Sequence, residues 1–292
     1  MARTDRSEFY LDDLWPKAFH RVDNGVRSVL SWRRWLKQHP DYMHAEGTMI
    51  YCGSQGAGKT LSAVRYLLAL MARYPQAVVC TNVGLTRFPF NACLAPDQPQ
   101  GWAYMAQDGV EGGSEAVQAS EGPGRPIVEY SGLDCLKYLS NGYQGVIYLV
   151  DELHLELNSL ESRNIDIDVI IEISQQRKQR KHIIGTSQQF MRLAKPLREQ
   201  VHDVVLCKCK FGRLQMNKWI DASTAVEKDG KLEAEIKKTS NFWHTPAMYS
   251  SYDTYAKMKR YQQEWQGRAR QDSLYRDEGG TDIVAKRRVR HG

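Results

Sequence analysis

The eight residues GSQGAGKT at positions 53–60 constrain the fold of this chain more than any other segment. They match the phosphate-loop pattern G-x-x-x-x-G-K-[ST]. Its glycines let backbone N–H groups surround phosphates, and the following helix directs its positive end at them. In this pattern Lys59 reaches the β- and γ-phosphates and the Thr60 hydroxyl binds Mg²⁺. The residues expected to bind a nucleoside triphosphate are Gly53, Ser54, Gln55, Gly56, Ala57, Gly58, Lys59 and Thr60.

The sequence around this loop indicates an α/β protein. An apolar run at 48–52 precedes the loop and a helical stretch at 61–74 follows it, which argues against an ordinary glycine-rich turn. Further strands are predicted at 77–83, 146–150 and 182–186, and a helix at 165–179. Strands separated by helices imply a mainly parallel sheet with helices on both faces. We therefore predict a RecA-like P-loop NTPase core.

Two acidic residues, Asp151 and Glu152, end the apolar run VIYLV at 146–150. A strand parallel to the first would bring both carboxylates to the edge of the sheet that carries the phosphate loop. Asp151 would then orient water on Mg²⁺, and Glu152 would be the general base for the attacking water. The alternative is a charged pair that merely ends a strand. The guanine-specificity motif N-K-x-D is absent, because the segment 217–221 has one residue too many, and this favours ATP over GTP.

The strand predicted at 182–186 ends in polar residues that are candidates for sensing the γ-phosphate. Thr186, Ser187 or Gln188 could hydrogen-bond the attacking water, although a polar loop after a strand would look the same. Just before this strand lies a basic segment that is either a solvated surface or the source of an arginine finger for a neighbouring subunit. Four arginines, which spacing alone does not separate, are candidates for this role: Arg177, Arg180, Arg192 and Arg198.

Composition is that of a water-soluble globular protein with a mild basic excess. The chain has 292 residues, of which 42% are hydrophobic, with 40 Lys and Arg against 34 Asp and Glu. A net charge of +6 excludes an acidic solvating protein but does not by itself establish nucleic-acid binding. No signal peptide or apolar run of membrane-spanning length is found, and the six cysteines form no C-x-x-C pair. We expect a protein of a reducing, intracellular compartment.

Three regions are predicted along the chain. Residues 1–47 form a helical extension, 48–221 the ATPase core with a loop-rich insertion at 84–126, and 222–292 a hairpin followed by a basic tail. The extension either packs on the main domain or lies on a membrane through Trp32 and Trp35. Within the core, 201–221 is predicted to form two antiparallel strands that turn at residues 212–213. A second hairpin is predicted around 228–231. The tail, from residue 253, has ten Lys and Arg against six Asp and Glu.

Residues 48–221 resemble the zonular-occludens-toxin-like ATPase domain. This family includes the filamentous-phage assembly ATPase and is related to the FtsK–HerA DNA motors and to viral packaging ATPases. The resemblance depends on GSQGAGKT, on VIYLVDELH and on the segment 174–199, SQQRKQRKHIIGTSQQFMRLAKPLRE. It implies that Arg177 is the arginine finger, that Gln188 is the sensor, and that subunits form a ring, expected to be a hexamer.

One difference from this family changes the function that we expect. Filamentous-phage and toxin-like members carry a membrane span after the ATPase domain, and no such span is found in this sequence. The expected function is an ATP-hydrolysing motor of phage or virus origin that translocates DNA during virion assembly, with genome packaging first and filamentous-phage export second. Its expected partners are DNA, capsid or membrane-vertex proteins and, peripherally, anionic membranes. The rival interpretation is a nucleotide-switched assembly factor that moves nothing; a small-molecule kinase is disfavoured because no lid-like arginine cluster is found.

Overall fold

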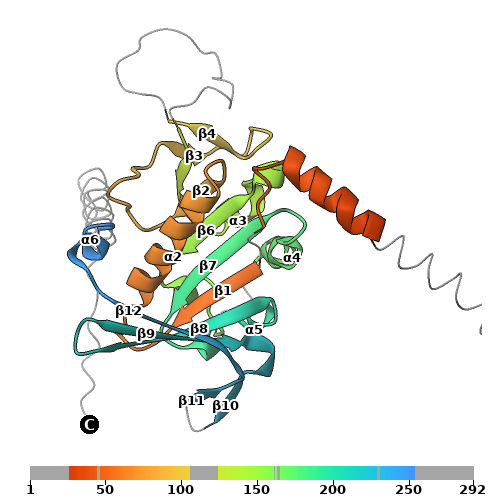
Figure 1. Ribbon diagram of the computed structural model, residues 1–292. Coiled ribbons are helices and arrows are strands. Elements are labelled where there is room, and N and C mark those ends of the chain that lie inside the picture. Colours follow the sequence, from red (N-terminus) through yellow and green to blue (C-terminus); the bar gives the residue numbers. More distant parts are fainter. Residues whose placement is uncertain are drawn as a thin grey trace, which may run out of the picture.

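The computed structural model describes residues 26–44, 47–105, 124–160, 162, 165–228 and 231–253. Within these ranges, ten strands form one sheet in the order β12-β9-β8-β1-β7-β6-β2-β5-β3-β4 (Figure 1). Seven neighbouring strands are parallel: β1 (Gly47–Cys52), β2 (Val78–Thr81), β3 (Ala92–Leu94), β5 (Ile127–Glu129), β6 (Val146–Val150), β7 (Lys181–Ser187) and β8 (Val201–Lys210). The predicted basic tail, with Lys286, Arg287, Arg288 and Arg290, lies outside the described residues.

Helices cover both faces of the sheet, as expected for parallel strands. Neighbouring residues of β1 pack against helices on opposite faces of the sheet, because successive side chains of a strand point in opposite directions. Tyr51 packs in one cluster with helix α2 (Lys59–Arg73), and Ile50 packs in another with α4 (Ile167–Gln175) and the short helices α3 (Asp134–Tyr138) and α5 (Lys195–Arg198). The predicted α/β core is therefore confirmed. The predicted helix at 165–179 is shorter than expected, since α4 ends at Gln175.

The insertion at 84–126 is predicted to be rich in loops, and its described part also contains two short strands that were not predicted. It contributes β3 (Ala92–Leu94) and β4 (Trp102–Tyr104), which extend the sheet beyond β5. Trp102 is 3% exposed and belongs to the core. Three-residue strands are too short to give a periodic pattern in the sequence, so neither strand could be predicted. Residues 106–123 lie outside the described part of the chain.

The other edge of the sheet is antiparallel. The predicted pair at 201–221 is confirmed as β8 and β9 (Leu214–Asp221). A further strand, β12 (Ile236–Trp243), pairs with β9 and was not anticipated. The predicted hairpin near residue 228 is present as β10 (Val226–Lys228) and β11 (Lys231–Glu233), and its turn lies outside the described residues. The short helix α6 (Pro246–Tyr249) follows β12.

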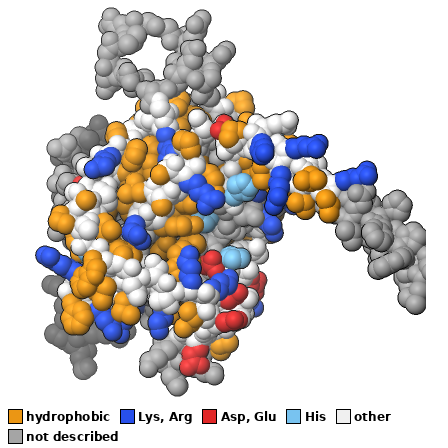
Figure 2. Space-filling view, viewed as in Figure 1, with side chains coloured by type: hydrophobic (Ala, Val, Ile, Leu, Met, Phe, Trp, Pro, Cys, Tyr) orange, Lys and Arg blue, Asp and Glu red, His pale blue; other side chains and the backbone are white. Residues whose placement is uncertain are grey.

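The N-terminal helix, of which residues 26–38 are described, projects from the body of the molecule (Figure 1). The interpretation that it packs on the main domain is wrong for most of its described length, because Val26, Val29, Leu30 and Trp32 are about half exposed. Figure 2 shows hydrophobic and basic side chains side by side on it. Its contact with the body comes at its end, where Trp32 and Trp35 pack on Tyr42, a ring that Arg180 covers at 4.4 Å.

None of the described helices combines the length and the apolar composition that a membrane span requires.

Gly185 on β7 lets two neighbouring segments approach the strand closely. A β-carbon at this position would lie 2.7 Å from Leu153 Cδ2 and 2.8 Å from Ile50 Cδ1. Leu153 begins η2 (Leu153–Leu155), the turn that directly follows Glu152. The absence of a side chain at residue 185 is therefore needed for this turn to pack against the sheet.

We predict that Gly185→Ala lowers the free energy of unfolding by about 1–3 kcal/mol, because an added methyl group overpacks the site. The measurement is urea-induced unfolding. In a Leu153→Ala background the same change should cost less, since the nearest crowding atom, Leu153 Cδ2, is gone while Ile50 Cδ1 remains. Equal costs in the two backgrounds would show that Leu153 is not the residue that excludes a side chain at position 185.

Candidate functional site

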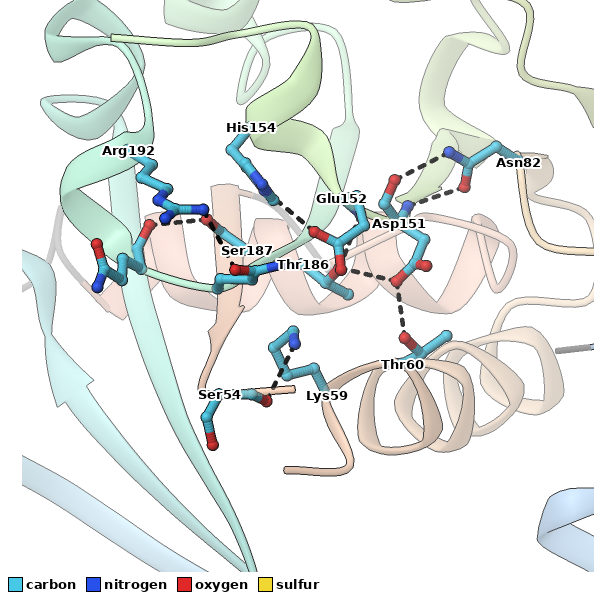
Figure 3. A network of polar contacts seen from close by, with 12 residues as sticks. Ser54, Lys59, Thr60, Asn82, Asp151, Glu152, His154, Thr186, Ser187 and Arg192 are labelled. Carbon is cyan, nitrogen blue, oxygen red and sulfur yellow. Dashed lines mark hydrogen bonds and ion pairs between the residues drawn. The ribbon is translucent and has the colours of Figure 1, made fainter. Parts of the chain in front are cut away.

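The phosphate-loop sequence forms the connection between β1 and α2. Gly56 and Gly58 have φ values of 74° and 76°, which L side chains rarely adopt, so glycine is needed at both. Lys59 is 7% exposed and donates from Nζ to the Ser54 carbonyl at 3.3 Å (Figure 3). The N-terminus of α2 has no side-chain cap, so its first N–H groups are directed at the loop. Such groups bind phosphate.

The acidic pair lies beside this loop. The Thr60 hydroxyl donates to Asp151 Oδ1 at 2.8 Å, and the Thr186 hydroxyl donates to the same oxygen at 2.8 Å (Figure 3). Strand β7, which carries Thr186, lies between β1 and β6 and so separates the phosphate-loop strand from the acidic strand. The hydroxyl and carboxylate oxygens that meet here are the donors that Mg²⁺ prefers, so the residues fit this ion.

Glu152 has an unusual backbone conformation. Its φ is 56°, in the left-handed region, and its N–H donates to Thr186 Oγ1 at 2.8 Å. A non-glycine residue in this region costs about 1–3 kcal/mol, and such strain is concentrated at functional sites. The side chain of Glu152 is 26% exposed, and Oε2 lies 3.3 Å from His154 Nδ1. The carboxylate is therefore held at the edge of the site, within reach of water.

Asn82 fixes the backbone of Asp151. Its Nδ2 donates to the Asp151 carbonyl at 3.1 Å, and its Oδ1 accepts from the Asp151 N–H at 2.8 Å (Figure 3). Sequence reasoning missed both Asn82 and His154. The signal for Asn82 was present, because it is a polar residue directly after β2, at the edge where the parallel strands end.

The three sensor candidates lie in different surroundings. Thr186 is fully buried and contacts both acidic residues. Ser187 donates to the Gln189 carbonyl at 2.7 Å. Gln188 is exposed, lines a pocket of about 150 Å³ together with Gly53, and accepts from Arg192 Nη1 at 3.2 Å. Of the three, Thr186 is the one that the structure brings into direct contact with Asp151.

The arginine-finger candidates lie at different places in the fold. Arg177 lies between α4 and β7, at the start of β7. At about 3.3 Å per residue this strand of seven residues puts Arg177 roughly 20 Å from the edge where Asp151 lies. Arg180 packs on Tyr42 near Arg177, and Arg198 contacts Met191. Arg192 follows β7 and is close to Gln188. Arg177 therefore lies near the end of β7 that is far from the phosphate loop of its own chain.

A buried polar residue on β9, Gln215, forms a hydrogen bond with the backbone of the phosphate loop. It is 0% exposed, and its Nε2 donates to the Ala57 carbonyl at 2.9 Å and to Asn217 Oδ1 at 2.8 Å. His244, which follows β12, lies 3.0 Å from Gln215 Oε1. Burial lowers the pKa of the His244 imidazole below its ordinary value, so the ring is neutral at pH 7. Sequence reasoning did not find Gln215.

A scan against models of known protein families finds no match, and neither does a search of curated proteins. Solved structures do show similarity. The N-terminal domain of zonular occludens toxin from Neisseria meningitidis aligns over 72% of this chain and 100% of its own, with 17% identity and a TM-score of 0.44. The genome packaging NTPase B204 from Sulfolobus turreted icosahedral virus 2, in complex with ATP-gammaS, aligns over 66% and 97%, with 9% identity and a TM-score of 0.43.

Proposed function

We propose that this chain is a Mg²⁺-dependent ATPase. The observation that carries the proposal is the Asp151 oxygen that accepts from both Thr60 and Thr186, beside Lys59 and Glu152. Thr60 on α2, Asp151 directly after β6 and Thr186 on β7 meet there, and together with Lys59 and Glu152 they supply the groups that phosphoanhydride hydrolysis needs. Thr60 and Asp151 would hold Mg²⁺, which neutralises negative charge on the phosphates when bound. The absence of the guanine motif supports ATP as the nucleotide.

The roles of the side chains follow from their positions. Lys59 and the N–H groups of residues 53–60 bind the phosphates. Glu152 accepts a proton from the water that attacks the terminal phosphorus, and its strained backbone keeps the carboxylate at the open side of the site. Thr186 holds Asp151 and the Glu152 N–H together, so it transmits changes at one acidic residue to the other.

We propose that ATP hydrolysis drives DNA translocation during virion assembly. Genome packaging is the leading form of this function, and filamentous-phage export is the alternative. The resemblance of residues 48–221 to viral and phage assembly ATPases and the basic segment after residue 253 support this. A ring of subunits in the host cytoplasm or on the virion would supply the arginine from a neighbour. The test is the ATPase rate with and without duplex DNA. A sustained rise supports the motor, and a DNA-independent rate with nucleotide-dependent partner binding supports the assembly factor instead.

We predict that Glu152→Gln lowers the ATPase rate by about 10²–10⁴-fold, the contribution of a general base, while ATP still binds. Lys59→Ala should lose both nucleotide binding and hydrolysis, because it removes the positively charged side chain that contacts the β- and γ-phosphates. Phosphate release and fluorescent-nucleotide titration measure the two effects. The control is Glu199→Gln, an exposed carboxylate away from the acidic pair. A near wild-type rate for Glu152→Gln would remove the residue from catalysis.

We predict that Arg177 acts in a neighbouring subunit. Arg177→Ala should bind ATP normally but hydrolyse it poorly, and mixing it with Lys59→Ala subunits should restore part of the activity. Recovery is expected because some interfaces then pair an intact phosphate loop with an intact arginine. Arg192→Ala, mixed in the same way, tests the arginine that lies at the phosphate-loop edge. If assemblies shown to be mixed recover activity only with Arg192→Ala, the finger is Arg192.

A further inference from the structure

The β8–β9 hairpin has two chemically different faces. Directly opposed residues of an antiparallel pair share a face, and the face alternates along each strand. Cys207 pairs with Asn217 and Cys209 with Gln215, so these side chains point to the α2 side of the sheet. The next pairs, Leu206 with Lys218 and Lys208 with Met216, point to the opposite side.

On the face toward α2, Gln215 forms a hydrogen bond with the phosphate loop. The orientation of the Gln215 amide is fixed, because the Ala57 carbonyl can only accept and must therefore face Nε2. Both hydrogens of Nε2 are then donated and Oε1 accepts from His244 Nε2. The Tyr249 hydroxyl lies 2.7 Å from the other ring nitrogen of His244. Every polar atom of this buried amide is therefore satisfied, and the loop is connected to the segment that ends at α6.

This support orients a donor of the phosphate loop. The C=O and N–H of a trans peptide point in opposite directions. The hydrogen bond from Gln215 to the Ala57 carbonyl therefore directs the Gly58 N–H away from Gln215 and β9. A side chain at Gly58 would clash with Gln215 Oε1, so this close approach requires glycine there.

The opposite face of the hairpin is basic and exposed. Lys208, Lys210 and Lys218 are all exposed, and no Asp or Glu of β8, β9 or β12 points to this side. Lys208 and Lys210 lie beyond Leu206, which pairs with the last residue of β1, so they extend past the edge that carries the phosphate loop.

The turn of the hairpin adds an aromatic residue to this surface. Phe211 is 88% exposed and has a φ of 52°, a conformation that a bulky side chain rarely adopts. It lies between Lys210 and Arg213, which is also exposed. An exposed aromatic ring between cations fits duplex DNA, where the cations neutralise phosphates and the ring wedges against a base step.

We propose that the exposed face and turn of the β8–β9 hairpin bind duplex DNA, and that Gln215 transmits this binding to the phosphate loop. The proposal rests on the ATPase function proposed above and names the surface through which DNA acts on it. DNA that shifts the hairpin also shifts Gln215, and with it the Gly58 N–H. Coupling between two ligands is reciprocal, so bound nucleotide must change the DNA affinity by the same factor.

The first experiment measures the affinity of the full chain for a fluorescent DNA duplex across a salt series. The triple variant Lys208→Gln, Lys210→Gln, Lys218→Gln should bind more weakly and lose up to about three units of log–log salt slope, at about 0.9 per phosphate contact. Phe211→Ala should weaken binding about tenfold with the slope unchanged, because a ring releases no counterions. The control neutralises three other exposed cations, Arg73, Arg87 and Lys178, in the same way. An unchanged salt slope in the hairpin triple variant would show that this surface does not bind DNA. Binding to anionic vesicles in place of DNA would also overturn the proposal.

The second experiment titrates a fluorescent ATP analogue with and without the DNA duplex. In the wild type, DNA should change the nucleotide Kd severalfold. Gln215→Met, which keeps the volume but makes no hydrogen bond, should still bind DNA and should lose this change. If Gln215→Met keeps the full change, the coupling does not run through Gln215. If the wild type binds no nucleotide, the proposed ATPase fails, whereas nucleotide binding without DNA binding overturns the hairpin surface alone.

Discussion

One carboxylate oxygen, Asp151 Oδ1, accepts hydrogen bonds from Thr60 and Thr186, and this contact requires one particular register of the central strands. Thr60 lies at the start of α2 after β1, Asp151 directly follows β6, and β7 carries Thr186 between these two strands. The three groups converge because Tyr51 pairs with Thr186 and Val150 with Gly185. A slip of β7 by one residue would turn Thr186 to the other face of the sheet and leave Asp151 without this contact. The parallel arrangement and the site are therefore specified together.

Much of this arrangement could be predicted from the sequence, because its signals are local. The glycines and Lys59 of the phosphate loop stand at fixed spacing, and the buried parallel strands are continuous apolar runs bounded by turn residues. Two acids directly after such a run, Asp151 and Glu152, must lie at the edge where the first strand also ends, provided the strands are parallel. The structure has this parallel sheet, with Asp151 in contact with Thr60 and the Glu152 N–H bonded to Thr186.

The remainder depends on contacts between residues far apart in the chain, which no local pattern encodes. Gln215 reaches Ala57 across 158 positions, and the surrounding segment looks only like a strand of mixed polarity. β12 could not be recognised because five of its eight side chains are polar or charged, and its pairing partner β9 already had the features of an edge strand. The short strands β3 and β4 carry no period, and the exposure of the N-terminal helix was hidden by its amphipathic sequence. Tertiary pairing decided each of these features.

The central claim is that the oxygen cluster around Asp151 holds Mg²⁺ for ATP hydrolysis. The most direct measurement is the rate of phosphate release from ATP as Mg²⁺ is titrated, in the wild type and in Asp151→Asn. This variant keeps the shape of the side chain and an oxygen acceptor but removes the charge. The account predicts magnesium-dependent release by the wild type, and for the variant a requirement for at least about tenfold more Mg²⁺, since a carboxylate is the stronger ligand for this ion. Identical magnesium dependence in the two proteins, or no release by the wild type at any magnesium concentration, would contradict it.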